Sequence, residues 1–206
     1  LGAFRTALAE ETLSGVDPPL SVNTTMVSVN LFQTLGAVPE VGRLFVDEDA
    51  ELADPGDTTV PRSVLISHRL WRQAFGGDPS VVGGTISLNA WPAIVVGVMP
   101  AGFFFLQEVD VWYPLQPGGR YTGSRSYHTW TLVGRLSRGV SMEQAQGQVG
   151  QAAEVLRPKA ARQIGADWVL VNAGGQKVNQ HRQCMGMLFF DVLHILHQMS
   201  DLCFEI

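Results

Sequence analysis

Histidines and cysteines, side chains that zinc prefers in proteins, gather near the C-terminus. His-x-x-Cys and His-x-x-His spacings occur in the set His181, Cys184, His194, His197 and Cys203. The Cys-x-x-Cys pair that anchors recognised zinc patterns is missing. His194 and His197 also lie in an apolar run that a helix face explains. We therefore expect no metal site.

Two opposing arguments bear on whether the two cysteines, Cys184 and Cys203, form a disulfide. An oxidising compartment would favour a bridge. One continuous helix would instead hold the two residues about 28 Å apart, which is beyond disulfide reach.

Ser67-His68 supplies a hydroxyl and an imidazole, the groups of a nucleophile and its general base. No Gly-x-Ser-x-Gly turn surrounds Ser67, and a serine at a helix start commonly caps backbone amides. The Gly-x-x-x-x-Gly-Lys-Ser/Thr phosphate-binding pattern is also missing. We therefore expect no catalytic residue, no cofactor-binding residue and no enzymatic activity.

Two further groups of side chains invite a binding hypothesis. The acidic cluster lacks the spacing of known calcium loops, and we expect it to be solvated. It contains Asp47, Glu48, Asp49, Glu51, Asp54 and Asp57. Four aromatic residues could line a pocket, but such residues more often belong to a core. They are Trp71, Phe75, Trp91 and Trp112.

Composition narrows the class of protein. The 206 residues can bury a core, and 46% of them are hydrophobic, as in globular proteins. The net charge of −5, with no basic block, argues against nucleic acid as a partner. No uninterrupted apolar run reaches membrane-spanning length. Because the chain begins at Leu1, we expect a processed product or a fragment, and composition fits a soluble piece of a membrane protein and a cytosolic protein equally.

Hydrophobic periodicity, together with the positions of glycine and proline, predicts the secondary-structure elements. Alternation or short apolar runs predict strands at 22–29, 63–66, 85–88, 93–98, 129–136 and 167–172. Helical spacing predicts helices at 30–35, 67–75 and 141–157, the last opening with the capping box Ser141-Met-Glu-Gln144. The Gly- and Pro-rich stretch 36–61 is expected to be a long surface loop, and 110–115, ending near Pro114, an edge strand. This order predicts an α+β fold, a mixed or antiparallel sheet with helices packed on one face.

Seven sequence runs, in order over roughly 120 residues, resemble the periplasmic core domain of MacB-like permeases, in the FtsX-like permease family. Among them are Gly-Arg-Leu-Phe, Val-Leu-Ile-Ser-His-Arg-Leu-Trp and Asp-Val-Trp. The runs occupy 27–37, 42–45, 64–83, 86–89, 95–103, 110–112 and 133–141.

The resemblance implies a porter-like lobe with a smaller second lobe, placed between two transmembrane helices of an ABC transporter permease. It implies a periplasmic location on the bacterial inner membrane and a role in coupling a cytoplasmic ATPase to export or mechanotransmission. Implied partners are the rest of the permease, the ATPase, a second permease copy and a periplasmic adaptor protein. The alternative is a stand-alone soluble enzyme or binding protein of unknown ligand.

The chain departs from the family in places. Ala90 stands where a glycine is common, so we expect the turn after Asn89 to be longer than two residues. Gly84 stands where a basic residue is usual. Residues 173–206 do not resemble the family. We therefore expect the core domain at 1–172, clearest over 27–149, followed by an atypical tail at 173–206.

Overall fold

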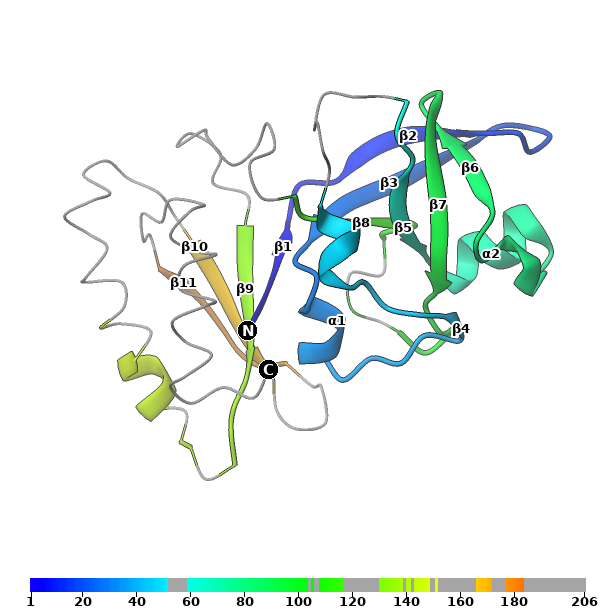
Figure 1. The fold of residues 1–206 in the computed structure, drawn as a ribbon. Helices are drawn as coiled ribbons and strands as arrows, with labels where there is room; N and C mark the ends of the chain where they lie inside the picture. Colours follow the sequence, from blue (N-terminus) through cyan, green and yellow to red (C-terminus); the bar gives the residue numbers. More distant parts are fainter. Residues whose placement is uncertain are drawn as a thin grey trace. The chain divides into compact units, whose positions relative to one another are not determined.

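The computed structural model describes residues 1–51, 59–103, 105, 108–116, 130–138, 140–141, 143–148, 151, 166–171 and 177–183. The chain forms two compact units. Unit 1 contains residues 1–6, 33–36 and 118–206, and unit 2 contains residues 7–32 and 37–117. Figure 1 shows the helices and strands of both units.

Six strands of unit 2 pair in a closed ring (Figure 1). They are β2 (Ala9–Ser14), β3 (Leu20–Val27), β5 (Arg62–Ile66), β6 (Thr85–Leu88), β7 (Trp91–Val98) and β8 (Val111–Pro114). Around the ring, β3 pairs with β2, β2 with β6, β6 with β7, β7 with β5, and β5 with β8, which returns to β3. The β5–β7 and β3–β8 pairs are parallel and the others are antiparallel. The mixed sheet is thus confirmed, but in unit 2 it closes into a barrel instead of offering one open face to helices.

Strand β8 completes this barrel. Its residue Trp112 pairs with Thr25 of β3 on one side and with Leu65 of β5 on the other. The prediction of an edge strand at 110–115 is therefore wrong. Pro114, opposite Val27, is accommodated because the parallel ladder to β3 uses the Leu115 amide, which donates to the Val27 carbonyl at 2.7 Å, and needs no amide at position 114.

The barrel interior is filled by apolar side chains at alternate strand positions, as the two-residue period of a strand requires. Val64 and Ile66 of β5 and Ile86 and Leu88 of β6 belong to this core. In β7 the alternation is Ala93, Val95, Val98. Val64 pairs with Val95 and Leu65 with Gly97, so Val96 is the extra residue of a β-bulge. The bulge restores the inward direction for Val98.

Helix α2 (His68–Phe75) follows β5 directly and contributes its apolar side to the same core. Leu70 and Trp71 are both buried there, and the Trp71 indole N–H donates to the Asp78 carbonyl oxygen at 2.8 Å. Ser67 caps the helix start, and Gly76, with φ of 62°, ends it. The predicted helix at 67–75 and the predicted burial of Trp71 are confirmed.

The β6–β7 hairpin has a two-residue turn. Asn89 and Ala90 have φ of 50° and 65°, and Leu88 pairs directly with Trp91. The prediction of a longer turn is therefore wrong. Asn89 supports the turn through two hydrogen bonds of 2.9 Å. Its backbone amide donates to the Thr12 carbonyl, and its side-chain oxygen accepts from the Thr12 backbone amide. These bonds to β2 hold a conformation that alanine rarely adopts.

The stretch expected to be a surface loop packs on the barrel instead. It contains β4 (Val41–Gly42), which pairs with the end of β7, and the 3-10 helix η1 (Asp47–Ala50). Phe45 is fully buried, and Asp49 is buried too. The surface-loop prediction is therefore wrong for this part, and 52–58 lie outside the described residues. A further 3-10 helix, η2 (Pro79–Val81), follows α2.

Unit 1 contains β1 (Gly2–Arg5), β9 (Trp130–Arg135), β10 (Ala166–Val171) and β11 (Lys177–Gln183). Strand β9 pairs antiparallel with β1 and parallel with β10, and β10 pairs antiparallel with β11. Helix α1 (Leu31–Thr34) ends next to Gly36, whose φ is 69°. In unit 1, the Arg135 Nε donates to the Thr34 carbonyl at 2.8 Å.

The predicted capping box is confirmed. The Gln144 amide donates to the Ser141 hydroxyl at 3.2 Å, and the Ser141 amide donates to the Gln144 side-chain oxygen at 2.8 Å. The helix that follows is described at 143–148. Of its predicted continuation to 157, residues 149–150 and 152–157 lie outside the described residues. Over the described part of the chain, no helix is both long and apolar enough to span a membrane.

Candidate functional site

The Ser67 hydroxyl serves the fold. It accepts a hydrogen bond from the Leu70 amide at 3.1 Å and lies 3.5 Å from a carboxylate oxygen of Asp110. These are the bonds of a helix cap, as the sequence predicted. The neighbouring His68 turns its Nδ1 to Glu40, 2.7 Å from the carboxylate, and sets its ring edge-on against Trp71 at 5.5 Å. The hydroxyl and the imidazole, which are neighbours in sequence, thus have separate structural partners.

Asp110 joins β3, β8 and α2 at this point. Its carboxylate is almost fully buried and accepts from the Arg69 guanidinium at 2.7 Å. The carboxylate also accepts from the Asn23 backbone amide at 3.1 Å, and the backbone amide of Asp110 donates to the Asn23 backbone carbonyl. A buried carboxylate requires such donors, because burial without them is costly. No motif of known chemistry marks Asp110 in the sequence, although this residue opens the Asp-Val-Trp run.

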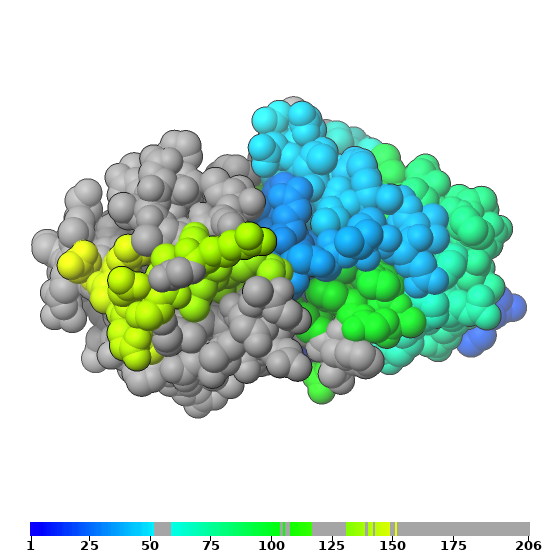
Figure 2. Space-filling model, turned by 90° about the horizontal axis from the view of Figure 1, so that it is seen from below, coloured from blue at the N-terminus to red at the C-terminus, as the bar shows by residue number. Residues whose placement is uncertain are grey.

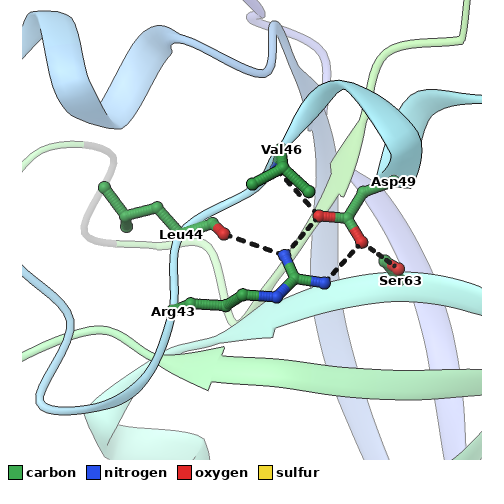
Figure 3. Close-up of polar contacts among 5 residues, drawn as sticks. All are labelled: Arg43, Leu44, Val46, Asp49 and Ser63. Carbon is green, nitrogen blue, oxygen red and sulfur yellow. Dashed lines mark hydrogen bonds and ion pairs between the residues drawn. The ribbon is translucent and has the colours of Figure 1, made fainter.

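A second polar cluster surrounds Asp49 (Figure 3). One carboxylate oxygen accepts from the Arg43 Nη1 at 2.5 Å and from the Val46 amide at 2.9 Å. The other accepts from the Arg43 Nη2 at 3.0 Å and from the Ser63 hydroxyl at 2.6 Å. Nη1 of Arg43 also donates to the Leu44 carbonyl. Asp49 therefore connects η1 to β5 and to the chain leaving β4.

The charge state of Asp49 follows from these contacts. Burial by itself would raise its pKa, but hydrogen bonds from Arg43, Ser63 and the Val46 amide, with the charge of Arg43, outweigh burial. The pKa of Asp49 is therefore lowered from its ordinary value. Asp49 is a buried, bonded anion, and the prediction that the acidic cluster is solvated is wrong for this residue.

Gly42, the first residue of the Gly-Arg-Leu-Phe run, lies where two backbone segments come close together. Its φ is 79°, and a Cβ at this position would collide with the Val96 carbonyl oxygen and approach the Gly97 Cα to 2.8 Å. The Arg43 amide then donates to that same Val96 oxygen at 3.0 Å. Only glycine permits so close an approach of two backbones, and the approach positions Arg43 for Asp49.

Phe45, at the end of this run, packs in an aromatic cluster on the outer side of the barrel. Phe32 is its centre, with ring centroids 6.1 Å from Phe45, 5.7 Å from Phe103 and 5.7 Å from Trp112. The Trp112 contact is edge-to-face, an arrangement that aromatic quadrupoles favour. On the face shown in Figure 2, the light-blue segment around 37–50 lies beside the green segment around 100–112. The prediction that Trp112 belongs to a core is confirmed.

Trp91 is placed differently. The residue is 40% exposed, so the prediction that it is a core residue is wrong. Trp91 is the first residue of β7, directly after the hairpin turn. The Arg62 guanidinium lies 4.5 Å from its ring centroid, a cation–π contact. Val60, also exposed, precedes β5 at the same end of this parallel pair.

Glu11, Thr24 and Tyr113 form a polar group on strands β2, β3 and β8. The Tyr113 hydroxyl donates to Glu11 at 2.8 Å, and the Thr24 hydroxyl lies 3.4 Å from the other Glu11 oxygen. Burial, followed by the charge of Glu11 and this hydrogen bond, raises the pKa of Tyr113 well above its usual range. Tyr113 is therefore a neutral donor that satisfies a carboxylate.

The metal candidates fall largely outside the described residues. This holds for Cys184, His194, His197 and Cys203, and His181 lies in β11. Within the described ranges, no three His, Cys, Asp or Glu side chains are arranged to hold a metal ion. Asp54 and Asp57 of the acidic cluster also lie outside those ranges.

A family model described as MacB-like periplasmic core domain matches residues 4–152. A search of curated proteins gave no match. Among solved structures, the periplasmic region of MacB from Actinobacillus actinomycetemcomitans is similar, with 15% identity and a TM-score of 0.51, covering 76% of this chain and 66% of that one. The extracellular domain of the noncanonic ABC-type transporter YknZ from Gram-positive bacteria gives 17% identity and a TM-score of 0.42, covering 54% and 53%.

The chain thus spans about half the length of the YknZ domain and 66% of the MacB region. The likeness to MacB supports the fold. The family match covers more than two thirds of the chain and includes the barrel, the Asp49 cluster and Asp110. The chain therefore belongs to the family of MacB-like periplasmic core domains.

Proposed function

We propose that this domain is a non-catalytic interaction and coupling module of an ABC-type transporter permease, acting in export or mechanotransmission. The observation that carries the proposal is the family match over residues 4–152, which includes the whole barrel of unit 2 and, in unit 1, strand β9 and the second half of β1. The fold similarity to the MacB periplasmic region supports it.

In this proposal the domain lies on the periplasmic side of the bacterial inner membrane, and the parent protein is membrane-anchored. Its partners are the transmembrane helices of the parent permease and a cytoplasmic ATPase. A second permease copy and a periplasmic adaptor protein are further candidate partners. The domain comprises residues 1–172, in a porter-like lobe with a smaller second lobe, and 173–206 form an atypical tail.

The proposed lack of catalysis draws support from the polar side chains themselves. The Ser67 hydroxyl is bonded to the Leu70 amide, and the His68 imidazole faces Glu40. A general base must reach the proton that it removes, and His68 is oriented toward a carboxylate. This arrangement favours a structural role for both residues.

The parent reading frame provides the most direct test. We expect that frame to encode transmembrane helices both before and after the domain. A complete frame without such helices would contradict the permease proposal and favour a stand-alone protein.

Coupling is tested in the full-length permease, reconstituted with its ATPase in lipid vesicles. Removal of residues 4–152 should leave basal ATP hydrolysis and abolish transport or partner-stimulated hydrolysis. The control is Gln73→Ala, at an exposed position of α2, which should retain both. Transport that continues at the original rate without the domain would refute the coupling role.

Catalysis is tested on the purified chain with ATP and with a generic ester. We expect no turnover above the buffer rate. Turnover that Ser67→Ala or His68→Ala abolishes, in variants whose circular dichroism matches that of the parent, would show an enzyme.

A further inference from the structure

We draw no further inference here: the strongest candidate, the rim of the unit 2 barrel where the exposed Trp91 stacks on Arg62 beside the exposed Val60, carries none, because nothing in the structure shows what covers it.

Discussion

Arg43 and Asp49 face each other with two hydrogen bonds, from Nη1 at 2.5 Å and from Nη2 at 3.0 Å. The side chain of Asp49 is 5% exposed, whereas that of Arg43 is 49% exposed. The carboxylate is therefore the partner that depends on the contact, since Arg43 can be hydrated if the pair breaks. This asymmetry determines how each half of the pair should respond to change.

Replacement of Asp49 by alanine should lower the free energy of unfolding by about 1–3 kcal/mol, because the Ser63 hydroxyl and the Val46 amide lose their acceptor. Chemical denaturation followed by circular dichroism measures this loss. The matched control is Asp47→Ala in the same 3-10 turn, an exposed position where a change within about 0.5 kcal/mol is expected. Equal losses for the two variants would show that the cluster contributes little.

Acid should weaken the same cluster. The folded-state pKa of Asp49 is lowered, so its contribution to stability is complete above the unfolded-state value of about 3.9 and is lost as pH falls through the folded value. The difference in unfolding free energy between the parent chain and Asp49→Asn should therefore shrink from neutral pH to about pH 3. A difference that stays constant over this range would contradict the assignment of an ionised Asp49. Asp47→Asn controls for net charge.

Alanine substitutions at Gly42 and Gly15 distinguish the energetic cost of backbone strain from the cost of close packing. Both have positive φ, 79° and 89°, but a Cβ at Gly42 would meet the β7 backbone, whereas one at Gly15 meets nothing within 4 Å. Gly15→Ala should cost roughly 1–2 kcal/mol from conformation alone. Gly42→Ala should cost roughly 1–3 kcal/mol more, because the two backbones must separate. Equal melting temperatures for the two variants would mean that β4 can move away from β7 freely.

Two tryptophans should respond in opposite ways to truncation. Trp71 is 6% exposed in the barrel core, so Trp71→Ala should lower the unfolding free energy by roughly 3–5 kcal/mol. Trp91 is 40% exposed, so Trp91→Ala should cost less than about 1 kcal/mol. Denaturant titration of both variants checks the contrast. A loss under about 1 kcal/mol for Trp71→Ala would contradict its burial.

The proposed boundary after residue 172 predicts that deletion of 173–206 leaves the melting temperature unchanged and improves solubility. Strand β11 lies within this stretch and pairs with β10. A second deletion, of 184–206, retains β11 and is the matched comparison. Loss of cooperative unfolding in the longer deletion alone would move the boundary to residue 183.

The sequence by itself determined the elements whose stabilising groups are neighbours in the chain. Ser67 caps α2 through an amide three residues away, and Gln144 reaches Ser141 over the same distance. Such bonds form within one helical turn, so residue type and spacing are sufficient to predict them. Strands β3, β5, β6, β7, β9 and β10 also followed from local alternation or short apolar runs, because one buried face imposes a period of two. Strands β1, β2, β4 and β11 lie where the sequence predicted no strand.

Only the tertiary structure decided which strands are neighbours. Thr24 pairs with Val111 across 87 positions, and this pairing converts a predicted edge strand into the closing strand of a barrel. It likewise decided that Asp49 is buried beside Ser63 and that Trp91 remains exposed. Burial and partners of this kind depend on which distant segments meet. Local periodicity does not predict these contacts. The spacing of apolar residues indicates which face of an element is buried, but not which segment covers that face.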